Sequence, residues 1–339
     1  MTIALDPHLY RDLDWYQRER FSVWSDQWLM FCSESEVAHD GSYVAAEIAD
    51  FPVVVARRPG GELVGFLNVC PHRAGPILWP GQGVTGNLVC RYHGWAFNWN
   101  GDLVSARDFG DSADLCPEQR GLTTIDVATW CGMVFIRIGK DSSSLIDDLG
   151  GLPTVVEQFP VDKFRFVRRM VRTLECNWKT YVDNYLEGYH VQLIHPSLTR
   201  ALDMRTYRVS VPEDGYCHHT CDTTEGSPSG GAWLFRYPNL ALNIYADGMN
   251  VERIIPVGAN KTHVVYDYYS ASTDEIDMES MISMSNVVLD EDQAMCEQVQ
   301  RAIDSGAYKG GPLSPKHEIA VAWFQSRILD EVNRPSRRS

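Results

Sequence analysis

Hydrophobic and polar positions divide the chain into three stretches with different periodicity. Aromatic and apolar residues at helical spacing between residues 9 and 31 predict an amphipathic helix or a pair of helices. From about residue 51 to 138 the pattern changes to short β-type runs, with turn signals at Gly60-Gly61 and Asn100-Gly101. This middle stretch is therefore predicted to be a small all-β domain.

The last stretch mixes extended and helical patterns. Extended runs over 233–245, 251–257 and 262–269 predict an antiparallel sheet, and helical patterns predict helices packed over it, at 177–190, 278–303 and 316–332. The predicted fold class is α+β. We expect a helical segment over residues 1–40 that packs on the last domain, a β domain over 41–145 and an α+β domain over 146–339.

Composition restricts the partners and the compartment. The 339 residues are 44% hydrophobic, enough for one large domain or two smaller ones, and the formal net charge of −15 argues against nucleic acid. No apolar run approaches the roughly 18 residues of a membrane span, and the first ten residues lack a secretory pattern. Nine cysteines is an odd number for full pairing. We therefore predict a cytoplasmic protein with reduced thiols and no membrane partner.

Two short segments of the β domain each carry one Cys and one His. Cys70 and His72 are one residue apart, and Cys90 and His93 follow after seventeen intervening residues. Two thiolates and two imidazoles bind tetrahedral zinc or a [2Fe–2S] cluster in which two His replace two Cys. Structural zinc sites usually begin with Cys residues two to four positions apart. The spacing favours the cluster, with zinc as the alternative.

A second group of polar residues lies in the predicted helix at 177–190. On an ideal helix Asp183, Glu187 and His190 share one face, and His195 follows shortly afterwards. Two His and one carboxylate on one face of an iron leave three positions open, as in non-haem Fe(II) oxygenases. The pair His190 and His195 is therefore a candidate iron site that requires one carboxylate.

The carboxylate is predicted to come from the helix near the C-terminus. Asp292 is the one charged residue at the centre of an apolar stripe, whereas Asp290 and Glu291 project away from it. A buried, unpaired carboxylate costs several kcal/mol unless a metal or another cation neutralises it. We therefore choose Asp292, with Asp290 as the second choice.

These motifs together resemble a known family. Cys-x-His and Cys-x-x-His are followed by Asn-Tyr-Leu-Glu-Gly-Tyr-His-(four residues)-His-Pro and, near the C-terminus, by Glu-Asp. The combination resembles the catalytic α subunit of Rieske non-haem iron oxygenases over nearly the whole chain. The resemblance implies a Rieske domain and a helix-grip-like catalytic domain. It also implies a [2Fe–2S] cluster on Cys70, His72, Cys90 and His93, and an Fe(II) on His190, His195 and Asp292.

The same resemblance implies a path for electrons. Glu187, where many members have Asp, bridges His190 to a cluster His of the adjacent subunit in a homotrimer, and Asp183 and Asn184 belong to the same catalytic segment. The chain shows no G-x-G-x-x-G motif after a strand and no second cluster motif. A separate reductase or ferredoxin that uses NAD(P)H is therefore implied.

The implied function is a terminal oxygenase that uses O2 to hydroxylate or oxidatively demethylate a small aromatic substrate. A quaternary ammonium substrate and cis-dihydroxylation of an arene are alternatives within the class. An electron carrier without oxygenase activity and a zinc-stabilised binding module are alternatives outside it. The sequence leaves open the substrate, mono- versus dioxygenation, the reductase and a β subunit. The pocket is expected to include Leu186, Leu193, Phe235, Leu242 and Ile244.

Overall fold

The chain divides into two compact units. The computed structural model describes residues 2–110, 115, 120–139, 143–212, 215–224, 231–272 and 275–334. One unit spans Trp24–Leu145, and the other combines Met1–Val23 with Ile146–Ser339. The first boundary differs from the one predicted at residue 40, because the strand at Leu29–Ser33 pairs with the strand at Met133–Arg137 and so belongs to the β unit.

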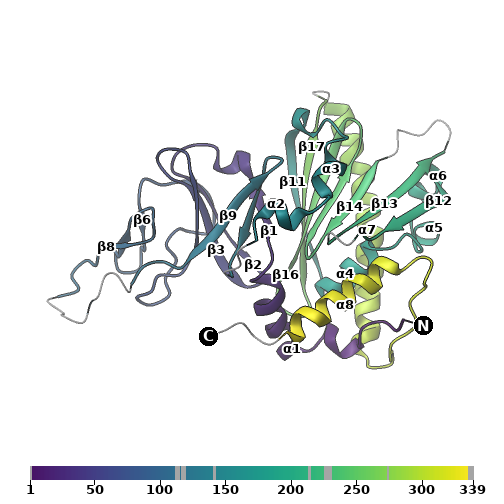
Figure 1. The fold of residues 1–339 in the computed structure, drawn as a ribbon, viewed down its shortest axis with the longest axis horizontal. Coiled ribbons are helices and arrows are strands. Elements are labelled where there is room, and N and C mark those ends of the chain that lie inside the picture. The colour runs from purple at the N-terminus through teal and green to yellow at the C-terminus, as the bar shows by residue number, and fades with distance from the viewer. Residues whose placement is uncertain are drawn as a thin grey trace. The chain divides into compact units, whose positions relative to one another are not determined.

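The β unit contains two antiparallel sheets (Figure 1). The larger has seven strands in the order β1-β10-β9-β4-β3-β2-β5, and β6-β7-β8 form the smaller. Its elements are β1 (Leu29–Ser33), η3 (Glu34–Val37), β2 (Ser42–Ile48), β3 (Phe51–Arg57), β4 (Leu63–Leu67), β5 (Gly81–Val84), β6 (Leu88–Val89), β7 (Ala96–Phe97), β8 (Leu103–Ser105), β9 (Thr124–Trp130) and β10 (Met133–Arg137).

Both predicted turns join paired strands. Gly60 and Gly61 have φ values of 99° and 88° and connect β3 to β4, a conformation that side chains with a Cβ rarely adopt. Gly101, with φ of 90°, lies in the turn between β7 and β8. The side-chain oxygen of Asn98 accepts the N–H groups of Asn100 and Asp102, each at 2.9 Å, and so closes this turn.

The second unit is a seven-stranded antiparallel sheet with helices on both faces, in the strand order β11-β17-β16-β15-β14-β13-β12. The α+β class is thereby confirmed. Its elements are η1 (Pro7–Tyr10), α1 (Leu13–Glu19), η2 (Arg20–Trp24), α2 (Leu145–Leu149), α3 (Leu152–Val156), η5 (Val161–Lys163), β11 (Arg165–Leu174), α4 (Trp178–Tyr185), α5 (Val191–Ile194), α6 (Pro196–Ala201), β12 (Leu202–Ser210), β13 (Tyr216–Thr223), β14 (Ala232–Arg236), β15 (Leu240–Ile244), β16 (Gly248–Pro256), β17 (Thr262–Ser270), α7 (Glu275–Asp304) and α8 (Ile319–Asn333).

Strand alternation divides the residues of this sheet between two faces. Cross-strand partners lie on the same face, and every second residue along a strand returns to it. We call the face that contains Glu252 the polar face. Its members from β13 to β17 are Cys217, His219, Trp233, Phe235, Ala241, Asn243, Asn250, Glu252, Tyr266 and Tyr268.

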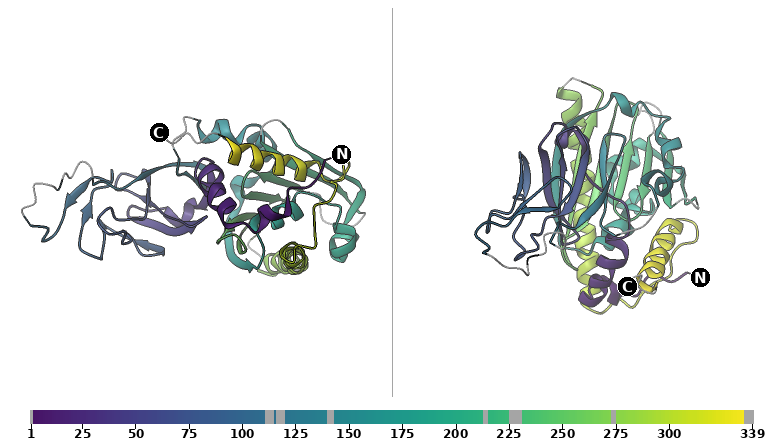
Figure 2. Two further views of the ribbon diagram at one scale, coloured as in Figure 1. Left: turned by 90° about the horizontal axis from the view of Figure 1, so that it is seen from below. Right: turned by 60° about the vertical axis from the view of Figure 1, so that its left-hand side comes forward.

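Helices α4 and α7 cover the polar face. The Tyr185 hydroxyl of α4 donates to Asn243 at 2.8 Å, and the Tyr268 hydroxyl meets the Ser285 hydroxyl of α7 at 3.0 Å. Figure 2 shows α7 in light green as a long helix running along the sheet. The other face meets α2, where Arg236 pairs with Asp148. The sheet therefore buries a polar layer against α4 and α7.

Two predicted helices differ from those observed. The segment at 9–31 is not one helix or a pair, because α1 ends at Glu19, a π-helical turn follows, and Leu29–Ser33 is a strand. The helix predicted at 177–190 ends at Tyr185. No helix in the described ranges is long and apolar enough to cross a membrane.

Candidate metal centres

The Cys and His residues of the β unit lie in two loops with the same hydrogen-bond pattern. The Cys70 carbonyl accepts the Ala74 N–H at 2.9 Å, and the Cys70 N–H donates to the Gly75 carbonyl at 2.8 Å. Cys90 repeats both bonds at the same spacing, at 2.8 and 2.9 Å. The fourth residue after each Cys has a positive φ, 56° at Ala74 and 78° at Gly94. Backbone bonds alone therefore fold each loop into the same tight turn.

The side chains of the two loops converge. The His72 and His93 rings lie 4.6 Å apart between centroids, and His72 stacks on Trp95 at 4.8 Å with an interplanar angle of 4°. Cys70 and Cys90 are both buried. Burial raises the pKa of the Cys70 thiol, and the neighbouring Cys90 raises it further, although N–H groups of its own loop oppose the shift.

This donor set fits a Rieske cluster. The Nδ1 atom of His72 is buried and has no hydrogen-bond partner among the described residues. Such a nitrogen costs free energy unless it binds something, and an imidazole nitrogen beside two thiols is an iron ligand in clusters with two Cys and two His. A Cβ added at Gly75 would lie 2.9 Å from the Cys90 sulfur, so this glycine keeps space beside that sulfur.

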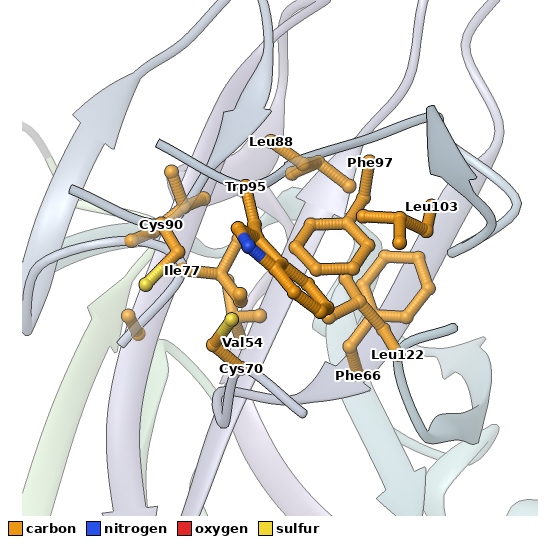
Figure 3. Close-up of a cluster of buried hydrophobic side chains, with 12 residues drawn as sticks. Val54, Phe66, Cys70, Ile77, Leu88, Cys90, Trp95, Phe97, Leu103 and Leu122 are labelled. Carbon is orange, nitrogen blue, oxygen red and sulfur yellow. The ribbon is translucent and has the colours of Figure 1, made fainter. Parts of the chain in front are cut away.

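A hydrophobic cluster supports both loops from the side opposite the cysteine sulfurs. In Figure 3, Trp95 has the two cysteine sulfurs on one side and a group of apolar side chains from the two sheets on the other side. Phe66 and Phe97 in that group are 2% and 5% exposed. Because a packed core is rigid, these hydrophobic side chains hold the two loops in one arrangement before any metal binds.

The second candidate centre begins at the end of α4. Asn177 caps this helix by accepting the Lys179 N–H at 3.0 Å. After Tyr185 the chain leaves the helix, and the Glu187 carboxylate accepts the N–H groups of Tyr189 and His190. These side-chain bonds replace helical ones, which explains why the predicted longer helix is wrong.

A glycine allows this departure from the helix. A Cβ at Gly188 would lie 2.6 Å from the ring of Tyr207 on β12, closer than packed atoms approach. The Tyr207 hydroxyl bonds to Nδ1 of the buried His219 at 2.6 Å, which fixes the ring in place. The close approach of Tyr207 therefore requires glycine at position 188.

His190, His195 and Asp292 meet at one point. Each offers one ligand atom, and the three atoms lie within 4.8 Å of one another. Asp292 Oδ1 is 3.0 Å from His195 Nε2 and 3.8 Å from His190 Nε2. The His190, His195 and Asp292 side chains are 18%, 1% and 13% exposed. Two imidazoles from the residues that flank α5 and one carboxylate from α7 thus converge, as an Fe(II) site requires.

A further carboxylate orients each histidine. Glu187 bonds to Nδ1 of His190, and Glu291 bonds to Nδ1 of His195 at 2.8 Å. Both rings therefore turn Nε2 towards Asp292, and each Nδ1 donates its proton outward. This is the usual arrangement of metal-ligating histidines. Burial lowers the pKa of His195, but bonds to Asp292 and Glu291 outweigh it and leave the pKa raised.

The remaining predicted residues of this segment separate into two groups. The Asn184 amide donates to Asp292 Oδ1 at 2.7 Å and so borders the metal ligands. Asp183, expected on the same face as Glu187, points elsewhere, because its carboxylate accepts bonds from Tyr10 at 2.5 Å and Gln325 at 3.1 Å. Asp290, the second choice for the iron ligand, pairs instead with Arg172 at 3.0 Å.

The predicted pocket residues do not form one group. Leu242 and Ile244 lie on the sheet face opposite Asn243, so the alternation of β15 removes them from the polar face. Leu193 is 84% exposed, whereas Leu186 is fully buried. Phe235 lies on the polar face and contacts the Tyr185 ring at 6.0 Å between centroids. Of the three predicted pocket residues that lie on strands, which are Phe235, Leu242 and Ile244, only Phe235 therefore borders α4.

Sequence reasoning missed two carboxylates. Glu291 was excluded because a helical projection points it away from the apolar stripe, but its long side chain still reaches His195. Glu252 lies on the polar face and is 4% exposed. The available signal was that Asn250 and Glu252 lie on either side of the apolar Val251, since residues two positions apart on a strand share one face.

Comparisons with known proteins identify both domains. Residues 27–115 match the Rieske [2Fe-2S] domain family, and residues 161–222 and 224–333 match the family described as ring hydroxylating alpha subunit (catalytic domain). Choline monooxygenase, chloroplastic, from Arabidopsis thaliana is 31% identical over 324 residues, which cover 89% of this chain and 76% of that protein. The carnitine monooxygenase oxygenase subunit of Escherichia coli K12 is 29% identical and covers 91% and 86%.

Solved structures share the fold over nearly the whole chain. A quaternary ammonium Rieske monooxygenase has a TM-score of 0.87 at 24% identity, covering 98% of this chain and 96% of the other. A naphthalene 1,2-dioxygenase has a TM-score of 0.79 at 19% identity, covering 96% and 92%. The shared fold therefore includes proteins named for two different substrate classes.

The fold and the two donor sets define an oxygenase with two iron centres. The chain belongs to the Rieske non-haem iron oxygenases, as a catalytic α subunit and terminal oxygenase. Its cofactors are a Rieske [2Fe–2S] cluster and a mononuclear iron. The predicted enzyme class is confirmed, and an electron carrier or zinc module does not account for the matched catalytic domain.

Proposed function

We propose that this chain is a monooxygenase of small quaternary ammonium compounds, which is the second of the substrate classes predicted from the sequence. The observation that carries the proposal is a tyrosine layer beside the iron ligands. We define the layer by its five members, Tyr181, Tyr185, Tyr245, Tyr266 and Tyr268.

Three members of the layer contact one another. The Tyr181 and Tyr266 hydroxyls lie 2.5 Å apart, and the Tyr266 and Tyr268 rings stack at 6.2 Å between centroids. Tyr245 meets Trp233 edge to face at 6.2 Å. Tyr181 and Tyr185 lie on α4 together with Asn184, whose amide donates to Asp292 Oδ1 at 2.7 Å. The layer therefore borders the candidate iron site.

Aromatic faces suit a quaternary ammonium group. Such a cation cannot donate a hydrogen bond, and ring faces stabilise it by cation–π attraction. A purely apolar arene needs no hydroxyl groups, whereas this layer is rich in them. The choline and carnitine monooxygenases found among the relatives support the same class.

The residues of the two centres have separate roles in this proposal. Cys70, His72, Cys90 and His93 hold the cluster, and His190, His195 and Asp292 hold the iron. When bound, the cluster supplies stored electrons and the iron supplies a site where O2 reacts. Glu187 and Glu291 keep Nδ1 of each iron-ligating histidine protonated, and Asn184 holds Asp292 by its Oδ1.

The overall reaction balances with one reductant. One oxygen atom of O2 enters a C–H bond of the substrate as a hydroxyl, and the other leaves as water. The balance requires two electrons and two protons. We propose that the electrons come from NAD(P)H through a separate reductase or ferredoxin.

The assembly and the location are part of the proposal. Glu187 would connect His190 to His93 of the adjacent subunit in a homotrimer, and a mass near three times 38.3 kDa in sedimentation would support this. A mass of one chain would contradict it. The cytoplasmic location also stays a prediction, since the relatives include chloroplastic proteins.

The substrate class is tested with a panel of candidate compounds. The holoenzyme is given a surrogate reductase, NADH and either choline, carnitine, naphthalene or indole. We expect O2 uptake and one hydroxylated or demethylated product with a quaternary ammonium compound. Turnover of the arenes without turnover of any quaternary ammonium compound would contradict the proposal.

A further inference from the structure

Glu252 lies at the centre of the polar face. Its Oε1 accepts the Asn243 amide at 2.6 Å, and its Oε2 accepts the Tyr181 hydroxyl at 3.1 Å. Tyr266, its cross-strand neighbour on β17, meets the same Tyr181 hydroxyl at 2.5 Å. The carboxylate thus joins β15, β16, β17 and α4 within one buried network.

The charge of Glu252 acts on the whole tyrosine layer. It contributes to the raised pKa of each of the five hydroxyls, after burial in every case. Burial raises the pKa of Glu252 itself to about 7, and the negative charge of Asp292 adds to this rise, although the hydrogen bonds to the carboxylate oppose it. The Tyr181 hydroxyl that bonds to Glu252 comes from α4, and the same helix carries Asn184, whose amide donates to Asp292. Glu252 therefore faces the helix that borders the candidate iron ligands.

No cation balances this carboxylate within the part of the chain that the structure describes. Among those residues Glu252 has no ion pair, and the largest effects on its pKa besides burial come from Asn243, two tyrosines and Asp292. Arg172 acts on Tyr268 but is paired with Asp290 at 3.0 Å. Glu19, Asp267 and Glu331, which are also buried in this unit, each pair with a cation, as Glu19 does with Lys179 at 2.7 Å.

A buried carboxylate without a cation is costly, and a bound cation would remove that cost. We propose that Glu252 is the residue that selects a positively charged substrate, by balancing the quaternary ammonium group held by the tyrosine layer. The inference rests on the proposed function and names the charge that complements the substrate. Asn243 and Tyr181 act as positioning residues, because their bonds hold the two carboxylate oxygens.

The test compares choline with 3,3-dimethylbutan-1-ol, its neutral carbon isostere. Binding to the oxidised holoenzyme is measured calorimetrically at pH 7 in buffers of different ionisation enthalpy. We expect the wild type to bind choline at least about tenfold more tightly than the isostere. Choline, unlike the isostere, should release up to about half a proton, because a nearby cation favours the ionised form of a group with a pKa of about 7.

Glu252→Gln keeps the shape of the side chain and removes the charge. We expect its preference for choline to fall to within about threefold and the proton release to disappear. Glu331→Gln is the matched control, since Glu331 is also buried and accepts a tyrosine hydroxyl, from Tyr237 at 3.1 Å, but pairs with Arg327. The control should keep the preference. Iron content and the cluster spectrum establish that each variant is folded.

Two failures are distinguishable. If the wild type binds the isostere as tightly as choline, or binds neither, the proposed function fails and the inference fails with it. If the wild type prefers choline and Glu252→Gln keeps both the preference and the proton release, only the role of Glu252 is overturned. Loss of the preference in Glu331→Gln to the same extent also overturns that role.

Discussion

The two candidate metal centres hold their ligands in different ways. At the cluster site, all four ligands lie within residues 70–93, and backbone hydrogen bonds fold the two loops that carry them. At the iron site, Asp292 lies about a hundred residues from the two histidines, and side chains orient every ligand: Glu187, Glu291 and Asn184. A backbone turn tolerates most changes of sequence, whereas a side-chain partner can be removed by one substitution.

The largest expected effect separates the two centres. His190→Ala should lower the rate of oxygenation by at least about a thousandfold, because it removes an iron ligand. The cluster spectrum should stay, since the cluster ligands lie in the other unit. His72→Ala is the reverse case and should lose the cluster spectrum. Loss of that spectrum in His190→Ala would mean that the two centres are not independent.

The second prediction concerns the outer carboxylate of His195. Glu291→Gln should lower iron affinity by about 10- to 100-fold. The neutral amide of Gln accepts a weaker hydrogen bond from Nδ1 of His195 than the carboxylate does, and so it orients the imidazole ring less firmly. Iron content after dialysis against graded chelator measures this. The neighbouring Asp290→Asn is the control and should keep its iron, since Asp290 is 62% exposed and pairs with Arg172. Equal iron loss in both variants would contradict the role of Glu291.

The third prediction concerns transfer between the centres. Glu187→Gln, at saturating iron, should keep both metals and slow the substrate-dependent oxidation of the reduced cluster by at least about tenfold. Stopped-flow absorbance of the cluster follows this step. An unchanged rate would remove the bridging role from Glu187 and leave it only as a partner of His190.

The smallest effect on either centre is expected at Asp183. Burial raises the pKa of Asp183 to about 7, against the bonds from Tyr10 and Gln325. Because the folded state holds this proton more tightly than the unfolded state, the stability it gives is present at low pH and is lost as pH rises towards 7. Between pH 5 and 7 the loss is about 2 kcal/mol at most.

Asp183→Asn cannot lose the proton, so its unfolding free energy should fall less over the same pH interval. Urea unfolding at pH 5, 6 and 7 measures the slope, with iron content as the control. An identical slope in the wild type and the variant would show that Asp183 does not titrate there, and loss of iron would place it nearer the metal ligands than its bonds indicate.

The difference between the centres also explains what the sequence could predict. Cys70, His72, Cys90 and His93 form a local motif at fixed spacing, so their meeting was predictable. The convergence of His190 and His195 with Asp292 was predictable from an unpaired carboxylate in an apolar stripe. By contrast, the position of Asp183 depends on Tyr10 and Gln325, which approach from distant segments.

The pocket was the least predictable part for a similar reason. Every residue of β15 is buried, so hydrophobicity could not distinguish its two faces. Only the pairing of β15 with β16 shows that Asn243, rather than Leu242 or Ile244, shares a face with Glu252. The end of α4 was missed because the Glu187 side chain bonds to its own backbone, which helical periodicity does not register.

Each chain should carry two separate iron centres, and a metal analysis of the whole protein counts both of them. Iron and acid-labile sulfide are counted in fully reconstituted protein. We expect three iron atoms and two sulfides per chain in the wild type, and two iron atoms with unchanged sulfide in His195→Ala. Two irons per chain in the fully loaded wild type would contradict this expectation.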